Sequence, residues 1–411
     1  MFESIKLQTK LRTKEIEPNQ NISFPIGTIE LVTSLYEILN FTDIFRKHKK
    51  NGVDINKLLK ALVSYKLTDN FSITRSHEWI RRPEVRDIFG LNKFSERTLY
   101  RVLETIGANR EEIISDIQDA LFERYEFEHT NINMDWTSIV LHGNEAKLGK
   151  YGYSRDHRPD KKQITMGVSE LADPINIPIG LTIEPGNLND QTHFKKTYRQ
   201  SRNRLKEESL VIFDKGANSI TNIAMIRADN LQYLTAKKLN KSDDKIIAKF
   251  EDYDPEVIDA ETGVRGSKIE KPNSINYFFF SKKLQKEQLQ SRARKVIRQI
   301  KEAKEIQESI DKNKALPKRF RINNLLIDVE YSIQTKLIAL TEDDAVKLLE
   351  DKIINGREGF FCLKSSKNLT LTEALLTYRK KDSIEKIFNS LKNEIEINHY
   401  EYGRITAFTE R

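Results

Sequence analysis

The stretch that decides the fold reads Tyr378-Arg-Lys-Lys381-Asp-Ser-Ile-Glu385-Lys-Ile-Phe-Asn-Ser-Leu-Lys392. It contains neither proline nor glycine, and its apolar residues recur at helical spacing, which predicts one continuous helix. At about 100° per residue, a sector of about 60° holds four polar side chains, those of Tyr378, Lys381, Glu385 and Lys392. Most helices of this composition only present salt-bridged charges to solvent, so the rest of the chain must show whether this one has a function.

Composition describes a globular, basic protein. The chain has 411 residues, more than one hydrophobic core usually serves, so two or three domains are expected. The net charge of +8 permits a polyanionic partner. A single cysteine, Cys362, excludes an internal disulfide framework and is typical of a reducing compartment. No apolar run reaches the roughly 18 residues that span a membrane, and no signal peptide is recognisable, so a cytoplasmic protein without a membrane partner is expected.

Residues 1–130 are predicted to form a helical N-terminal DNA-binding domain. Short helical segments are separated by Asn-Gly, proline and glycine, and one helix is expected over residues 27–45. Ser95 is a candidate N-cap of a helix that presents Arg97 and Arg101 one turn apart. A helix, a turn and a short basic helix are typical of a helix-turn-helix unit, although many small helical domains share the pattern.

Residues 131–239 predict the first part of an α/β core. Residues 131–141 alternate as a partly buried strand with Asp135 in its middle. A later apolar run ends in Asp214-Lys-Gly. Further strands are expected at 164–171, 177–183, 210–213 and 231–236, with helices from about Gln191 and Ile220. Three strands in series, then helix, strand, helix and strand is the order of a ribonuclease H-like sheet.

Residues 240–350 are lysine-rich and less regular, and they predict an α+β insertion domain ahead of the last catalytic helix. Within it the sequence favours a strand at 277–280, a charged helix at 282–312 and one or two strands at 325–340. Residues 351–411 would return to the ribonuclease H-like core and contribute the helix quoted above.

Three acids, Asp135, Asp214 and Glu385, are the candidate catalytic residues. Taken singly, each has an ordinary interpretation: a strand acid facing solvent, a turn-forming aspartate and a helix-surface glutamate. In a ribonuclease H-like core, however, these three positions converge. Clustered carboxylates raise one another's pKa unless a counter-charge is present, and Mg²⁺ is bound by carboxylate oxygens together with phosphate and water. Two such ions activate the attacking oxygen and stabilise the leaving oxygen at one phosphodiester.

The chain resembles the DDE transposases of bacterial and archaeal insertion sequences, in the insertion-sequence-four group. That group has a Tyr-x2-Arg-x3-Glu-x6-Lys signature, and this sequence has Tyr378, Lys381, Glu385 and Lys392 at the same spacing. Asn133-Met-Asp135-Trp-Thr and Asp214-Lys-Gly are similar to the contexts of the family's first two acids. The segments 152–163 and 186–190 are also similar to family members.

The resemblance implies an activity, cofactors and partners. It implies hydrolysis of the phosphodiester at each transposon end and attack of the freed 3′-hydroxyl on target DNA. Asp135, Asp214 and Glu385 would hold Mg²⁺, for which Mn²⁺ can substitute. DNA would be the partner, as terminal inverted repeats and target, with a homodimer on the DNA. The expected DNA contacts are Tyr378, Lys381, Lys392, Arg155, His157, Arg158, Lys162, Arg97 and Arg101, of which His157 is almost as readily interpreted as an ordinary loop residue.

Two departures from the family leave alternatives open. Lys381 replaces a planar guanidinium with a point charge, which changes how a phosphate is gripped. Family members usually continue past the position of Arg411 with an apolar helical segment, so a C-terminally truncated, catalytically inactive transposase that only binds DNA is one alternative. A ribonuclease H-like nuclease acting on RNA or a heteroduplex is the other, and recognition of the 2′-hydroxyl would distinguish it.

Overall fold

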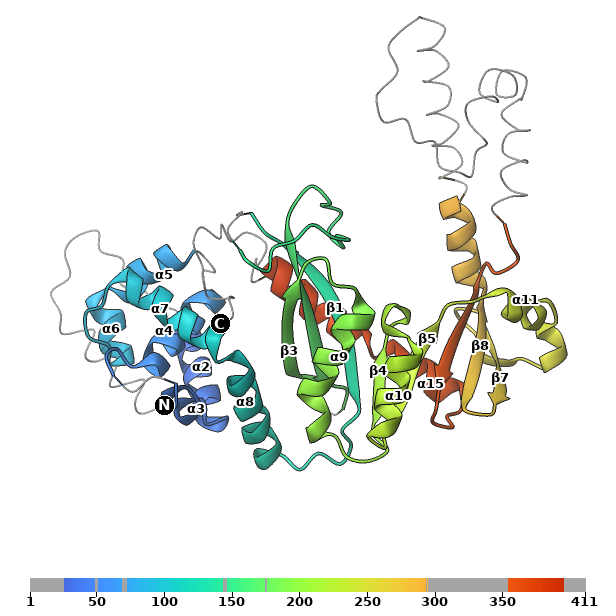
Figure 1. The fold of residues 1–411 in the computed structure, drawn as a ribbon, viewed down its shortest axis with the longest axis horizontal. Coiled ribbons are helices and arrows are strands. Elements are labelled where there is room, and N and C mark those ends of the chain that lie inside the picture. The colour runs from blue at the N-terminus through green and yellow to red at the C-terminus, as the bar shows by residue number, and fades with distance from the viewer. Residues whose placement is uncertain are drawn as a thin grey trace, which may run out of the picture. The chain divides into compact units, whose positions relative to one another are not determined.

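The computed structural model describes residues 26–48, 51–68, 72–142, 146–173, 176–292, 294 and 354–394 (Figure 1). The chain forms two compact units. The first comprises residues up to Gln232 together with those from Arg379 onward, and the second comprises residues 233–378. Among the described residues, no helix is long and apolar enough to cross a membrane.

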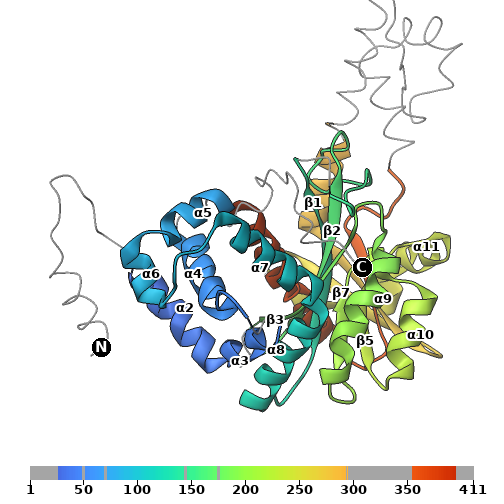
Figure 2. The ribbon, with the colours of Figure 1, turned by 60° about the vertical axis from the view of Figure 1, so that its left-hand side comes forward.

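The N-terminal part of the first unit is helical, as the sequence predicts (Figure 2). The expected helix over residues 27–45 is two helices, because Asn40 adopts the left-handed conformation with φ 51° and ends the first one. Pro83 begins a helix that Gly90 ends with φ 60°. The helices are α2 (Ile26–Ile38), α3 (Phe41–Arg46), α4 (Ile55–Thr68), α5 (Ile73–Ile80), α6 (Pro83–Phe89), α7 (Glu96–Ala108) and α8 (Arg110–Arg124).

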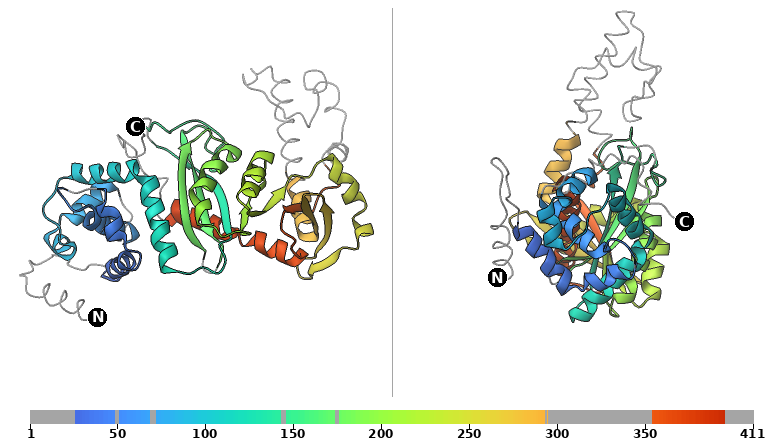
Figure 3. Two further views of the ribbon diagram at one scale, coloured as in Figure 1. Left: turned by 60° about the horizontal axis from the view of Figure 1, so that its bottom comes forward. Right: turned by 90° about the vertical axis from the view of Figure 1, so that its left-hand side faces the viewer.

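One hydrophobic core holds these helices together. Ile55 and Leu58 of α4, Ile80 of α5 and Leu99 of α7 are fully buried in it. The last helix, α8, lies beside the sheet of the same unit (Figure 3, left). There the Gln118 side-chain amide donates a hydrogen bond of 2.8 Å to the carbonyl oxygen of Ile179. The helical region therefore ends on a helix that is bonded directly to the sheet.

The first unit contains four neighbouring strands of a sheet, in the order β3-β2-β1-β4. β1 is antiparallel to β2 over nine registered pairs and parallel to β4. The strands agree with the predicted ones to within two residues: β1 (Ile132–Val140), β2 (Gln163–Leu171), β3 (Ile177–Pro185) and β4 (Leu210–Phe213). β5 (Gln232–Lys237) begins where the Gln232 N–H donates to the carbonyl oxygen of Ser209, at the start of β4.

Helices cover both faces of this sheet (Figure 1). On one face α9 (Asp190–Ser201) buries Phe194 and Tyr198, and its Thr197 hydroxyl accepts a hydrogen bond from the Trp136 indole. On the other face α16 (Asp382–Asn389) packs Ile384 and Phe388 against β1 and β2. The alternation of β1 produces this division, because successive side chains of a strand point to opposite faces. A further helix, α10 (Ile220–Ala228), follows β4.

The second unit has an antiparallel arrangement of strands in the order β5-β9-β8-β7-β6. Tyr277, Phe278 and Phe279 of β8 are fully buried, so this strand supplies much of the hydrophobic core of the second unit. The sequence predicted β8 but did not identify its neighbours. The remaining elements are β6 (Glu256–Asp259), β7 (Val264–Lys271), β8 (Ser274–Ser281), β9 (Phe360–Ser365), α11 (Lys241–Ala248) and α15 (Leu371–Arg379).

The predicted single helix over residues 378–392 is wrong. α15 ends at Arg379, a turn follows at Lys380 and Lys381, and α16 begins at Asp382 and continues as a π-helical turn over Ser390–Glu394. Residues 282–292 are helical, in agreement with the first part of the predicted helix at 282–312. The rest of that helix, the predicted strands at 325–340 and the end of the chain past residue 394 lie outside the described residues.

Candidate active site

Two of the three predicted acids are positioned by one pair of parallel strands. Met134 of β1 is registered with Phe213 of β4, and Asp135 and Asp214 are the next residue along each strand. Laterally paired residues of parallel strands point to the same face of a sheet. The register therefore places the two carboxylates beside each other, where β4 ends. Asp135 also accepts a hydrogen bond of 2.8 Å from the Trp136 backbone N–H to its Oδ1.

A buried ammonium group neutralises one of these acids. Lys381 Nζ donates to Asp135 Oδ2 over 2.7 Å, and the two side chains are only 8% and 15% exposed. Lys381 is the residue immediately before α16, so the packing of Ile384 and Phe388 on the sheet fixes its position. On a continuous helix, Lys381 would lie one turn before Glu385 and could pair with it. In the structure Lys381 instead lies in the turn before α16 and reaches across to β1.

A second buried acid anchors the start of α16. The Glu170 side chain is fully buried on β2, and its Oε2 accepts hydrogen bonds from Asn133 Nδ2 at 3.0 Å and from Ser383 Oγ at 2.5 Å. Ser383 lies in the first turn of α16, where a negative charge is favoured by the helix dipole. These contacts join β1, β2 and α16 close to Asp135. Sequence reasoning did not identify Glu170, because it reads as one polar residue within an apolar strand.

The third predicted acid, Glu385, is presented differently. Its side chain is exposed on α16, and among the described residues it makes neither a hydrogen bond nor an ion pair. The carboxylate oxygens of Asp135, Asp214 and Glu385 do not all lie within 4.8 Å of one another. Carboxylate oxygens are ligands that Mg²⁺ prefers, and Asp135 already holds a cationic group in Lys381. The carboxylate oxygens therefore suit a hard divalent cation in their chemistry, although they are not gathered around one point in the free protein.

A comparison of the sequence with known protein families identifies the family of this chain. The family model described as transposase DDE domain matches residues 127–405, which cover the sheet of the first unit, all three acids and α16. The chain belongs to the transposase DDE domain family. A comparison with curated proteins gave no match.

Two solved transposase structures are similar to this family member over part of their length. One is the cryo-EM structure of the piggyBac transposase synaptic complex with hairpin DNA, with 11% identity, a TM-score of 0.41, and coverage of 90% of this chain and 69% of that chain. The other is the Mos1 transposase paired-end complex with left transposon end, with 13% identity, a TM-score of 0.18, and coverage of 40% and 58%. Because both TM-scores are low, the family assignment rests on the sequence match.

Asp190 is a further acid of the DDE domain site that the sequence reasoning did not single out. It begins α9, and its Oδ2 accepts a hydrogen bond of 2.7 Å from the Arg155 guanidinium. A side chain on Gly216 would place its Cβ 2.5 Å from the same oxygen, so the Asp214-Lys-Gly turn needs glycine there. Burial raises the pKa of Asp190, the Arg155 charge lowers it, and the charges of Asp135 and Asp214 raise it. Asp190 therefore belongs electrostatically to the same site.

The loop before β2 contains most of the predicted DNA contacts of the DDE domain, and both of its arginines are already paired. Arg155 donates a hydrogen bond to Asp190, and Arg158 forms a bidentate ion pair with Asp160. Lys392, beyond α16, reaches back to Asp156 of the loop over 2.7 Å. The structure thus brings Lys392 and the loop together.

The remaining predicted contacts lie in several places. His157 is exposed in the left-handed region with φ 56°, and Lys162 is half-buried at the end of the same loop. Arg97 and Arg101 are exposed on α7, and Ser95 is its N-cap residue but makes no capping hydrogen bond. Tyr378 lies on α15 in the second unit, so it does not share a helix with Glu385.

Proposed function

We propose that this chain is a DDE transposase of an insertion sequence, in the insertion-sequence-four group, that cuts and joins DNA. The observation that supports this most strongly is the placement of Asp135 and Asp214 side by side, where β4 ends next to β1, with Lys381 bonded to Asp135. A structural role alone would not require two acids and a buried lysine at one sheet position, since burying charge is costly unless it is paired. The family match supports the same reaction class.

The catalytic core is proposed to be ribonuclease H-like. In its support, three antiparallel strands are followed by a parallel β4 beside β1, and β5 begins next to β4. Helices α9 and α16 cover the two faces of this sheet. Residues 1–130 would be the DNA-binding domain, 131–239 and 351–411 the core, and 240–350 the insertion domain.

Asp135, Asp214 and Glu385 are proposed to hold Mg²⁺, which supplies activation of the attacking oxygen and stabilisation of the leaving oxygen. Lys381 maintains the charge balance of Asp135 in the free protein, and it can turn its ammonium group to a phosphate oxygen when the acids gain another partner. Two further cations are proposed to donate hydrogen bonds to DNA phosphates. They are Arg155, which is paired with Asp190, and Lys392, which is paired with Asp156 of the loop before β2.

The reaction proposed for this site has two steps. Water attacks phosphorus at each transposon end, the bond to the 3′ oxygen breaks, and that oxygen leaves as a hydroxyl group. The freed 3′-hydroxyl then attacks the phosphorus of a target phosphodiester, the bond from that phosphorus to the target's own 3′ oxygen breaks, and this oxygen leaves as a hydroxyl group, without a covalent protein intermediate. Because both ends of an element are joined, the active form is proposed to be a homodimer on DNA.

The test is a nicking assay on linear duplex DNA taken from the borders of the gene, with unrelated duplex of equal length as the control. We expect Mg²⁺- or Mn²⁺-dependent nicks confined to the border DNA. DNA binding without nicks would instead establish a catalytically inactive protein. Preferential cleavage of an RNA–DNA heteroduplex would establish the nuclease alternative, and either outcome would overturn the proposal.

A further inference from the structure

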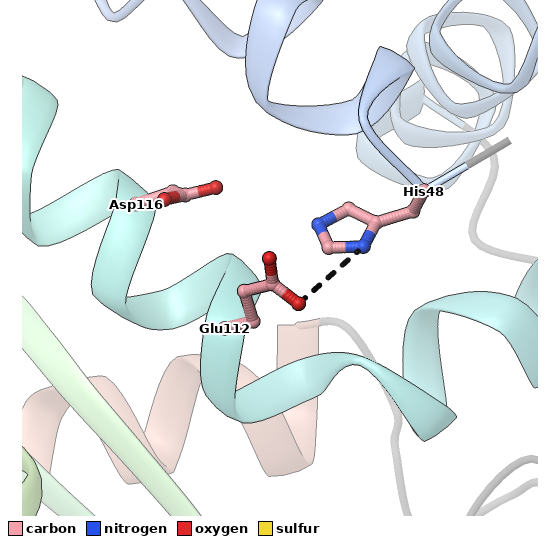
Figure 4. Close-up of side chains that lie close together, drawn as sticks. All are labelled: His48, Glu112 and Asp116. Atoms are coloured by element: carbon pink, nitrogen blue, oxygen red, sulfur yellow. Dashed lines mark ion pairs between the residues drawn. The ribbon is translucent and has the colours of Figure 1, made fainter. Parts of the chain in front are cut away.

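A second cluster of metal-ligating side chains lies in the helical region, away from the catalytic acids. His48 follows α3, and Glu112 and Asp116 are four residues apart on α8. One ligand atom from each of the three lies within 4.8 Å of the others. Because residues four apart share a helix face, both carboxylates of α8 face the histidine (Figure 4). Among the described residues, this is the group of three whose ligand atoms already lie that close together.

The histidine carries the strongest indication of a ligand. Its side chain is only 4% exposed, and its Nδ1 lies 4.0 Å from Oε2 of Glu112. Its Nε2 is buried and has no hydrogen-bond partner among the residues that the structure describes. Figure 4 shows that this nitrogen is on the side of the ring toward Asp116. A buried polar atom without a partner costs free energy, so a ring nitrogen directed into a carboxylate cluster needs an occupant.

The charges around the cluster also favour a cation. Glu112 and Asp116 contribute two carboxylates, and one cationic partner is already present, since Lys47 Nζ donates to Asp116 Oδ2 over 3.0 Å. The Lys47 side chain is 56% exposed and can turn away into solvent at little cost.

We propose that His48, Glu112 and Asp116 form a binding site for a divalent transition-metal ion, and that the ion is Zn²⁺. One imidazole with two carboxylates suits zinc, which takes nitrogen and oxygen ligands and completes its coordination with water. Mg²⁺ is excluded as the natural occupant, because it prefers oxygen ligands. The site is independent of the catalytic acids and of the function proposed for them.

Such an ion would connect the end of α3 to α8. α8 is also the helix whose Gln118 is bonded to Ile179 of β3. Metal binding would therefore stiffen the junction between the helical region and the sheet within the first unit. The three ligands come together only in the folded protein. An ion that binds them therefore stabilises the folded state relative to the unfolded chain.

The test is a Zn²⁺ titration of the full-length, chelator-treated protein against a chromophoric competitor, with Mg²⁺ in excess. We expect one Zn²⁺ ion per chain and a higher Tm on its addition. Glu112→Gln and Asp116→Asn should each weaken binding at least about tenfold. Glu112 is 65% exposed, so its variant should fold normally even if a variant of buried His48 does not.

Two controls make the outcome decisive. Glu111→Gln removes the same charge from the same turn of α8 without touching the cluster, and Asp214→Asn removes a catalytic acid; both should bind Zn²⁺ as the wild type does. A wild-type protein that takes up no Zn²⁺ would overturn the proposal. So would Glu112→Gln binding Zn²⁺ with unchanged affinity, or Asp214→Asn losing the ion.

Discussion

The strands β1 and β4 and the helix α16 position the candidate catalytic acids in two different ways. Asp135 and Asp214 come directly after Met134 and Phe213, the last registered residue pair of the parallel strands β1 and β4. Backbone hydrogen bonds between these strands therefore fix the separation of the two acids. Glu385 is on a helix of 8 residues that packs on the sheet through Ile384 and Phe388. Its side chain is exposed, and none of the described residues pairs with it.

The positions of Asp135 and Asp214 are therefore fixed by the strands of the sheet, whereas the position of Glu385 depends on how α16 is anchored to the sheet. The anchors are the Lys381–Asp135 pair and the hydrogen bonds among Asn133, Glu170 and Ser383. Changes to these anchors should therefore displace Glu385 while Asp135 and Asp214 stay in register. The predictions below run from the largest expected effect on stability to the smallest.

The largest effect is expected for the buried ion pair. Asp135→Asn leaves the Lys381 ammonium buried without a counter-charge, so the free energy of unfolding should fall by about 3 kcal/mol. The matched control is Asp173→Asn, which breaks the exposed pair with neighbouring Lys380 and should cost less than about 1 kcal/mol. Urea unfolding in chelator gives both numbers, and equal losses would contradict the anchoring role of Lys381.

A smaller, more local effect is expected at the first turn of α16. Ser383→Ala removes one of the two hydrogen bonds to the buried Glu170 carboxylate and should cost about 1.5 kcal/mol. Amide hydrogen exchange should then accelerate in α16 but not in β1 or β4, and Ser383→Thr should restore most of the protection. Equal acceleration in the strands would show that helix and sheet open together.

The helix on the opposite face supplies a pH test. Burial, together with the charges of Lys196 and Arg155, lowers the pKa of His193 on α9 from 6.5 to about 3. The unfolded chain takes up this proton below about pH 6.5 while the folded chain does not, so stability is lost as the pH falls from there toward 3. The contribution is about 1 kcal/mol per pH unit near pH 5.

His193→Asn should flatten this dependence, as measured by urea unfolding at several pH values. The exposed residue His129 is the control, and its replacement should leave the slope unchanged. An unchanged slope in His193→Asn would mean that the folded protein protonates this histidine as readily as the unfolded chain does.

The smallest stability effect is expected for Glu385 itself. Because the side chain is exposed and forms no pair among the described residues, Glu385→Gln should change the free energy of unfolding by less than about 0.5 kcal/mol. A loss as large as that of Asp135→Asn would mean that Glu385 stabilises the fold and is not kept for binding.

Much of the fold could be predicted from the sequence, because the local pattern of apolar and polar residues determines where strands and helices form. The alternation around Asp135 and the apolar run before Asp214 gave β1 and β4 almost to the residue. β6 and β7 contain many polar residues and no regular apolar alternation, so only their pairing in the folded chain identifies them.

The site was predicted less completely, for reasons that lie in tertiary contacts. Nothing in the local sequence indicates the break at Lys381, whose partner in the structure is an aspartate 246 positions earlier in the chain. Asp190 was recognised only as part of a similar segment, and its place near Asp135 and Asp214 follows from where α9 begins. Sequence spacing alone cannot report such contacts.

The measurement that tests the central claim most directly is metal-dependent nicking of border DNA by the wild type and by Glu385→Gln, side by side, after unfolding curves show that both are equally folded. Asp135, Asp214 and Glu385 are claimed to act together on bound metal, so the wild type should nick the DNA in Mg²⁺ or Mn²⁺ and Glu385→Gln should not. Nicking by Glu385→Gln at the wild-type rate would contradict the assignment of α16 to the catalytic site.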